Sequence, residues 1–183
     1  MFAITPRLLL RPGWPEDSDA LFAAINDEAI VRNLARVPWP YQRDDAREFL
    51  SPSADPASPR WLIFSRTNGA PELAGSIGID SQDNGTVELG YWISRPHWGR
   101  GYATEAGQAV LQNARSLGHK RLVASHFIDN PASASVLRKL GFKPTGQMVR
   151  RFSQGRNRAV QAVEFSCLLD EEQATDDMRP LAA

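Results

Sequence analysis

The segment ELGYWISRPHWGRGYATEA, residues 88–106, reads as a strand, a short glycine-rich turn and the start of a helix. In the strand part, apolar side chains alternate with Glu88, Gly90 and Trp92, which is the period of a half-buried strand. After the turn at residues 98–103, apolar residues recur every three or four positions as far as Leu117. That spacing predicts an amphipathic helix, which the following glycine ends.

The turn between this strand and this helix is a candidate phosphate site. A glycine turn at a helix N-terminus gathers free backbone N–H groups at the positive end of the helix dipole. Gly99 and Gly101 let the backbone approach an anion closely, and Arg100 adds positive charge. A P-loop would need a Gly-Lys-Ser/Thr sequence and a dinucleotide fold would need a third glycine at Thr104, so neither pattern fits. A tight loop without a ligand is the alternative.

Two further segments narrow the choice of ligand. One is Asn-Pro-Ala-Ser at residues 130–133, which opens a helical stretch that ends at Gly141, and the other is TPRLLLRP at residues 5–12. With the glycine turn, in this order and spacing, they resemble the GNAT superfamily of acyl-CoA-dependent N-acetyltransferases. Within it the resemblance is to the branch that acetylates N-terminal residues of ribosomal proteins, and it covers residues 5–169. Trp98 departs from the Gln or Arg that usually opens the family's pyrophosphate loop, Gln/Arg-x-x-Gly-x-Gly/Ala.

Composition indicates an ordinary globular protein. The 183 residues predict one domain, residues 1–170, and a polar tail, residues 171–183. Lys and Arg number 21, as do Asp and Glu, and this balance argues against nucleic acid or membrane as the main partner. Cys167 is the only cysteine, so we expect it in the core, with neither an internal disulfide nor a metal site. Without a signal-like or membrane-spanning apolar run, we expect a soluble, cytoplasmic protein.

The order of the patterns predicts an α+β fold. Strand patterns occupy residues 2–11, 61–66, 73–80, 87–93, 121–127, 147–152 and 159–169, and helical patterns occupy residues 14–26, 27–34, 44–50, 103–117 and 131–140. A polar loop at 51–59 and turns at 68–69 and 83–85 separate them. We expect a three-layer α/β/α domain with a mixed, mostly antiparallel central sheet and helices on both faces. The resemblance implies the same, the GNAT acyl-CoA N-acyltransferase fold.

The resemblance also implies acetyl-CoA as the cosubstrate. The strand that ends at residues 91–93 would pair with the pantetheine arm, the turn at 98–104 would bind the pyrophosphate, and a backbone N–H near Ile93 would stabilise the oxyanion. The cofactor-binding residues implied are Trp92, Ile93, Trp98, Gly99, Arg100, Gly101, Tyr102, Ala103, Thr104, Asn130 and Ser133.

Two residues are candidates for proton transfer. Glu88 is the candidate general base, directly or through water; the alternative is a solvated or structural carboxylate, with His126 or His97 as the base. Many family members have a tyrosine as general acid where Leu137 stands here. The Asn-x-x-Ser pattern makes Ser133 the candidate acid instead, with Asn130 orienting it or the pantetheine; both could also be plain helix caps.

The acceptor is an amine that the sequence does not identify. We expect Trp39 and Tyr41 to line its site, flanked by the basic hairpin around residues 150–158. Members of the branch can carry a glutamate near the start of that hairpin, where this chain has Val-Arg-Arg-Phe, so an anionic acceptor or a plain solvated turn also fits. A protein N-terminus, a small-molecule amine and a non-catalytic CoA-binding module are the alternatives, and a homodimer is left open.

Overall fold

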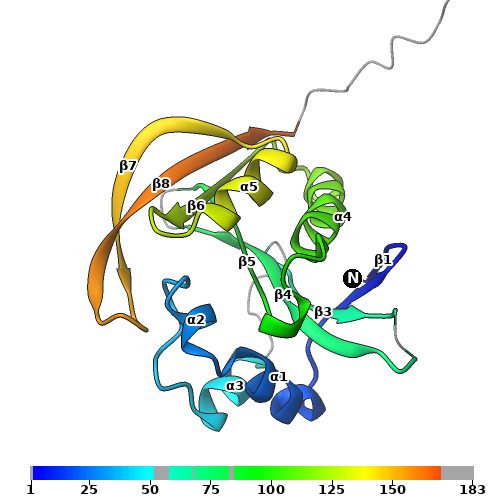
Figure 1. Ribbon diagram of the computed structural model, residues 1–183. Coiled ribbons are helices and arrows are strands. Elements are labelled where there is room, and N and C mark those ends of the chain that lie inside the picture. Colours follow the sequence, from blue (N-terminus) through cyan, green and yellow to red (C-terminus); the bar gives the residue numbers. More distant parts are fainter. Residues whose placement is uncertain (1, 52–57, 68, 83–84, 170–183) are drawn as a thin grey trace, which may run out of the picture.

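The computed structural model describes residues 2–51, 58–67, 69–82 and 85–169. Its eight-stranded sheet has the order β1-β2-β3-β4-β5-β6-β8-β7 (Figure 1). The strands are β1 (Ala3–Ile4), β2 (Leu8–Arg11), β3 (Arg60–Ser65), β4 (Glu72–Ser81), β5 (Val87–Ile93), β6 (Arg121–Phe127), β7 (Lys143–Ser153) and β8 (Arg158–Leu168). Every neighbouring pair is antiparallel except β5 with β6, which confirms the mixed, mostly antiparallel sheet predicted from the sequence. The predicted loop at 51–59, the two turns and the tail fall largely or wholly outside the described residues.

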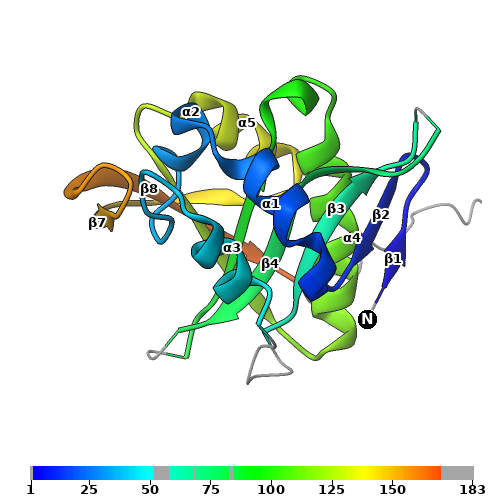
Figure 2. The ribbon, with the colours of Figure 1, turned by 90° about the horizontal axis from the view of Figure 1, so that it is seen from below.

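Helices cover both faces of this sheet (Figures 1 and 2). On one face lie α1 (Ser18–Ile25), α2 (Glu28–Val31) and α3 (Arg43–Phe49), preceded by the 3-10 turn η1 (Pro15–Asp17). On the other lie α4 (Tyr102–Ser116) and α5 (Pro131–Lys139). Each face has its own buried apolar cluster, and Cys167 belongs to the one under α4 and α5, as predicted. None of the helices in the described ranges has the length and apolarity needed to cross a membrane.

The first predicted strand, residues 2–11, is wrong as a single element. The chain forms a hairpin there, because Thr5 N–H donates to the Leu8 carbonyl at 2.9 Å and turns the backbone between β1 and β2. Pro6 lies in this turn, where its missing N–H costs no ladder bond. The alternation of apolar and polar residues does not reveal such a turn, because it continues unchanged from β1 into β2.

The candidate site lies where the backbone pairing of the sheet is interrupted. Strands β5 and β6 run parallel and share a single register pair, Glu88 with Val123. Each is paired along its length on its other side, β5 with β4 and β6 with β8. The edge of β5 that faces β6 therefore has no further ladder partner among the described residues.

The basic hairpin β7–β8 is docked on the α1–α3 side, so the expectation of a plain solvated turn is wrong. Gln154 N–H donates to the Ala35 carbonyl at 2.9 Å, and Ser153 Oγ donates to the Leu34 carbonyl at 3.0 Å. Arg156, whose side chain is 8% exposed, donates to both carboxylate oxygens of Asp129 at 2.7 and 2.9 Å. These contacts hold the hairpin tip against the chain that follows α2 and against the β6–α5 turn.

Candidate active site

The predicted phosphate site, the glycine turn, lies at the N-terminus of α4. The 3-10 turn η2 (Arg95–His97) follows β5, and residues 98–101 then lead into α4. Gly99 and Gly101 have φ values of 73° and 76°, a left-handed backbone that glycine adopts without the steric cost of a Cβ. Gly101 is the N-cap of α4, and the first amides of a helix have no acceptor within it. Residues 98–101, which precede these amides, are exposed.

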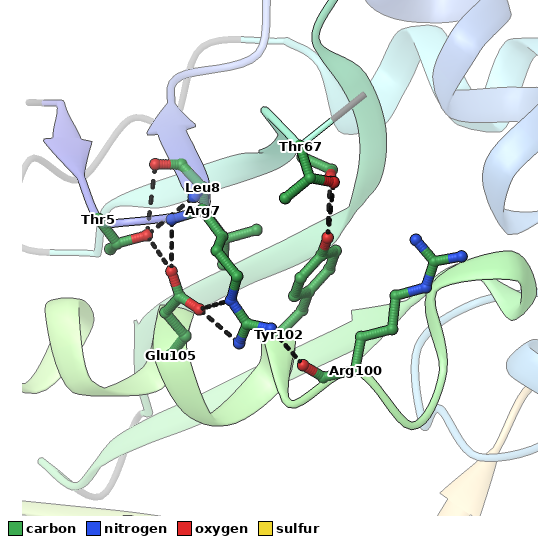
Figure 3. A network of polar contacts seen from close by, with 8 residues as sticks. Thr5, Arg7, Leu8, Thr67, Arg100, Tyr102 and Glu105 are labelled. Carbon is green, nitrogen blue, oxygen red and sulfur yellow. Dashed lines mark hydrogen bonds and ion pairs between the residues drawn. The ribbon is translucent and has the colours of Figure 1, made fainter. Parts of the chain in front are cut away.

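The residues predicted to bind the cofactor differ in what they can present. The side chains of Trp92 and Tyr102 are buried, at 7% and 2% exposed, in the two opposite apolar clusters, so only their backbones can meet a ligand. Ala103 and Thr104, in the first turn of α4, are half-buried. Arg100 is exposed, and Figure 3 shows its guanidinium directed away from the ion pair between Arg7 and Glu105.

Trp98 connects the loop to the end of β5. Its indole Nε1–H donates to the Ile93 carbonyl at 2.7 Å, while the side chain stays 46% exposed. The residue that departs from the family pattern thus fixes the peptide that follows the predicted pantetheine strand. This contact links the end of β5 to the glycine turn.

A pair of hydroxyls joins β5 to the start of α5. Asn130 caps α5, because its Oδ1 accepts from Ser133 N–H at 3.3 Å, and this is the capping alternative considered for it. The Ser133 hydroxyl lies 2.7 Å from the Tyr91 hydroxyl. Burial raises the pKa of Tyr91 to about 12, although the hydrogen bond from Ser133 acts in the opposite direction. The sequence pattern does not single out Tyr91 as a functional residue, because its alternation with Gly90 and Trp92 marks it only as an inward-facing strand residue.

Glu88 is a buried carboxylate with two partners. Arg151 Nη1 lies 2.9 Å from it, and Ser125 Oγ donates to it at 3.3 Å. Its side chain is 11% exposed. Arg151 belongs to the predicted basic hairpin, so one of those arginines serves the candidate base. Both partners donate to the carboxylate, Ser125 to Oε1 and Arg151 to Oε2.

The two candidate groups lie on opposite faces of the same strand. Successive side chains of a strand point to opposite faces. Tyr91 therefore shares the α4–α5 face with Leu89, whereas Glu88 shares the α1–α3 face with Trp92. The unpaired edge of β5 lies between the two faces.

The two histidines considered as alternative bases are engaged elsewhere. His126 lies on the α4–α5 side, where its ring packs on Phe165 and its Nδ1 lies 2.8 Å from the Phe127 carbonyl. His97 is buried with its Nδ1 2.8 Å from Ser94 Oγ. Burial and the Arg100 charge lower the pKa of His97, against the opposing effect of Glu72.

The two aromatic residues expected to line the acceptor site, Trp39 and Tyr41, differ in exposure. Trp39 is 37% exposed and can meet a ligand. Tyr41 is only 4% exposed, because its ring stacks on Phe22 within the apolar cluster under α1 and α3. Burial raises its pKa to about 12, with further contributions from Asp45 and Glu48. Placing the Tyr41 side chain against an acceptor is therefore wrong for this structure.

A split mixed sheet, a glycine turn at the helix after β5 and polar groups on both sides of the split fit the acyl-CoA N-acyltransferase fold that the sequence resemblance implies. Residues 7–143 match the acetyltransferase (GNAT) domain family, which is more than half of the chain. The chain belongs to the GNAT family, and it is an acetyl-CoA-dependent N-acetyltransferase.

Two curated proteins and one solved structure illustrate the likeness. An uncharacterized N-acetyltransferase, p20 of Bacillus licheniformis, is 29% identical over 91% of this chain and 96% of its own length. The ribosomal-protein-serine acetyltransferase of Escherichia coli strain K12 is 35% identical over 39% of this chain and 41% of its own length. The structure of RimL, a ribosomal L7/L12 alpha-N-protein acetyltransferase in complex with coenzyme A, superposes with a TM-score of 0.77. It is 20% identical, covering 93% of this chain and 99% of the other, which shows the shared fold.

Proposed function

We propose that this enzyme transfers an acetyl group from acetyl-CoA to the amine of a protein N-terminus, by direct attack in a ternary complex. The observation that carries the proposal is the placement of Glu88 and the Tyr91–Ser133 pair on opposite faces of β5, beside its unpaired edge. An acceptor on the α1–α3 side and a donor on the α4–α5 side would meet there. Holding two reactants in line supplies a large part of the rate enhancement of such transfers.

On the donor side, the backbone is the main binding element. The pantetheine arm takes the free edge of β5 near residues 91–93, and its pyrophosphate takes the N–H groups at residues 98–104. The N-terminal end of α4 favours the diphosphate charge. A backbone N–H near Ile93 stabilises the oxyanion that forms when the amine attacks the thioester carbonyl.

On the acceptor side, Glu88 takes the proton that the ammonium must lose before attack. The amine nitrogen then bonds to the acetyl carbon, and collapse of the tetrahedral intermediate breaks the bond from carbon to sulfur. Ser133 gives its proton to the departing thiolate and regains one, through solvent, from the second proton that the attacking nitrogen loses. The Tyr91 hydroxyl, 2.7 Å away, orients Ser133 for that transfer. Positioned acids and bases typically contribute roughly a hundred- to ten-thousand-fold in rate.

Two observations bear on the acceptor. The likeness to the ribosomal-protein-serine acetyltransferase of Escherichia coli supports a protein N-terminus. Arg151, which stands beside Glu88 where the branch can carry an acid, supports a second candidate, a small amine with an anionic group. A cytoplasmic location belongs to the proposal, and a homodimer stays a prediction from the sequence.

Turnover against an acceptor panel tests the proposal. Thiol release from acetyl-CoA would be measured with peptides that begin with alanine or serine, with the same peptides blocked at the N-terminus, and with neutral and anionic small amines. We expect turnover on free N-termini and none on the blocked peptides. A preference for small amines over every peptide would contradict the protein acceptor, and selective turnover of anionic amines would establish the second candidate.

A further inference from the structure

The turn between β1 and β2 is tied to the first turn of α4 through Glu105 (Figure 3). The Glu105 carboxylate accepts from Thr5 Oγ1 at 2.6 Å, from Arg7 N–H at 2.9 Å and from Arg7 Nε at 2.7 Å. About 98 to 100 residues of chain separate the partners. Nothing in the transfer chemistry uses these residues, although the glycine turn lies directly beside them.

Besides the Glu105 carboxylate, the Arg7 side chain also contacts the glycine turn itself. Its Nη1 donates to the Arg100 carbonyl at 2.9 Å, and its guanidinium lies 5.0 Å from the centre of the Tyr102 ring. A Cβ placed on Gly101 would lie 3.6 Å from Arg7 Nη2. The Tyr102 hydroxyl is held in turn 2.9 Å from Ser65 Oγ. The arginine is therefore fixed by three neighbours and sits against the peptide that joins Arg100 to Gly101.

The orientation of this peptide matters for anion binding. In a trans peptide the C=O and the following N–H point in opposite directions. A hydrogen bond that holds the Arg100 carbonyl toward Arg7 therefore directs the Gly101 N–H away from Arg7, to the other side of the loop. Gly101 has a φ of 76°, and glycine has access to both signs of φ, so the loop itself does little to prevent rotation of this peptide. A rotated peptide would present a carbonyl oxygen to the diphosphate.

The contact between Arg7 and Glu105 also affects the charge in the first turn of α4, next to the glycine turn. Burial alone would raise the pKa of Glu105, but hydrogen bonds from Thr5 and from the amide and guanidinium of Arg7 outweigh it and lower the pKa. Glu105 is therefore a carboxylate within the first turn of α4, where an unpaired charge would repel a second anion. The Arg7 guanidinium neutralises it and leaves the helix N-terminus free for a phosphate.

We propose that Arg7 is a positioning residue for the donor, which holds the Arg100–Gly101 peptide in the orientation that binds the pyrophosphate, and that Thr5 and Glu105 hold Arg7. The proposal rests on the pyrophosphate site of the proposed function. It differs from a plain structural tie between β1–β2 and α4, because its effect falls on the diphosphate part of the donor alone.

The test compares two donors that differ in that part. Arg7→Ala would be assayed with acetyl-CoA and with S-acetyl-pantetheine, which lacks the pyrophosphate, and coenzyme A affinity would be measured by calorimetry. We expect the dissociation constant of coenzyme A and the KM of acetyl-CoA to rise roughly tenfold, the change that follows the loss of one charge-assisted hydrogen bond. The kcat at saturating acetyl-CoA and the kcat/KM of S-acetyl-pantetheine should stay unchanged.

Two variants make the comparison specific. Arg7→Lys keeps the charge but cannot bond the carboxylate and the carbonyl with one planar fork, so it should restore the affinity only in part. Arg47→Ala removes a similar exposed arginine, paired with Asp44 at 2.6 Å on α3, and should leave both donors unaffected. If Arg7→Ala fails to fold, Arg7→Lys carries the test.

Three results would overturn the inference. Unchanged coenzyme A affinity in both folded Arg7 variants would show that the peptide needs no support. Equal losses with both donors would show a structural tie. A wild-type protein that binds no coenzyme A would remove the pyrophosphate site together with the proposed function, and this result is distinct from the first two.

Discussion

The hydroxyls of Tyr91 and Ser133 lie 2.7 Å apart and join the central strand to the N-terminal end of α5. Burial raises the pKa of Tyr91 to about 12, against the opposing effect of the hydrogen bond with Ser133, so the phenol stays protonated at neutral pH. A protonated phenol can donate to Ser133 Oγ. When it does, the proton of Ser133 is free for another acceptor, as a general acid requires.

Substitution of Ser133 should lower turnover more than substitution of Tyr91. Ser133→Ala removes the proton donor, and kcat should fall roughly a hundredfold at all pH values, because protonation of the thiolate follows the attack. Tyr91→Phe removes only the orienting hydroxyl, so kcat should fall less, roughly tenfold, with coenzyme A affinity unchanged. Ser135→Ala, an exposed serine on the same helix, is the control. Wild-type kcat in Tyr91→Phe would show that Ser133 needs no orientation.

Glu88→Gln should produce a loss that depends on pH. The amide keeps the size of the side chain and removes its charge, so kcat should fall roughly a hundredfold at pH 7. Part of the loss should return above about pH 9, since a free α-amino group has a pKa near 8 and then arrives neutral. pH–rate profiles of the variant and of Glu164→Gln, a half-buried glutamate on β8, make the measurement. A profile identical to wild type would assign the proton to water or another group.

Gly101→Glu should abolish coenzyme A binding, because it places a side chain and a negative charge at the phosphate site. Gly118 offers a matched control, since it has a φ of 83° at the opposite end of α4. Both glutamates adopt a left-handed backbone that costs about 1–2 kcal/mol, so both variants should lose similar stability. Calorimetry should show lost affinity only in Gly101→Glu. Retained affinity in that variant would move the phosphate site elsewhere.

Trp39→Ala and Tyr41→Ala should affect different properties. Trp39 is exposed, so its truncation should raise the KM of the acceptor and leave coenzyme A affinity nearly intact. Tyr41 is buried, so its truncation should lower the free energy of unfolding by about 3 kcal/mol. Acceptor kinetics and denaturant unfolding separate the two effects. A large loss of coenzyme A affinity in folded Trp39→Ala would place this residue on the donor side.

Asp17 should make the protein sensitive to acid. It forms a two-point ion pair with Arg11, with both N–O distances 2.7 Å and both side chains 11% exposed. Burial alone would raise its pKa, but the hydrogen bonds from Arg11 and the Trp14 amide lower it overall. The pair therefore stabilises the fold fully above the unfolded pKa of about 3.9, and this stability is lost as the pH falls through the folded value.

The variant Asp17→Asn measures that contribution. It leaves Arg11 buried without its counterion and should lower the stability at pH 7 by roughly 3 kcal/mol. The difference from wild type should shrink below pH 4, where Asp17 takes up a proton first in the unfolded wild-type chain and then, at lower pH, in the folded one. A difference in melting temperature that is constant from pH 7 to pH 3 would contradict this account.

Local patterns were enough to predict most of the fold. The strand and helix periods around residues 88–106, the cap at Asn130 and the left-handed Gly141 are all present, because each depends on neighbours in the sequence. The contacts of Glu88 were not predictable in this way. Arg151 lies 63 residues away, and a register shift between Pro144 and Met148 in the β7–β8 pair helps to decide which of its residues reach Glu88. Burial of Tyr41 likewise depends on its distant partner Phe22.

The single register pair between β5 and β6 has a consequence for motion. It divides the backbone ladder into one hydrogen-bonded unit of β1 to β5 and another of β6 to β8, joined at Glu88 and Val123. Separating these units by a small angle breaks few ladder bonds, whereas opening any antiparallel pair would break many. The apolar cluster under α4 and α5 contains Leu89 of one unit and Leu122 and Phe165 of the other, so side-chain packing, more than the backbone ladder, resists rotation at this seam.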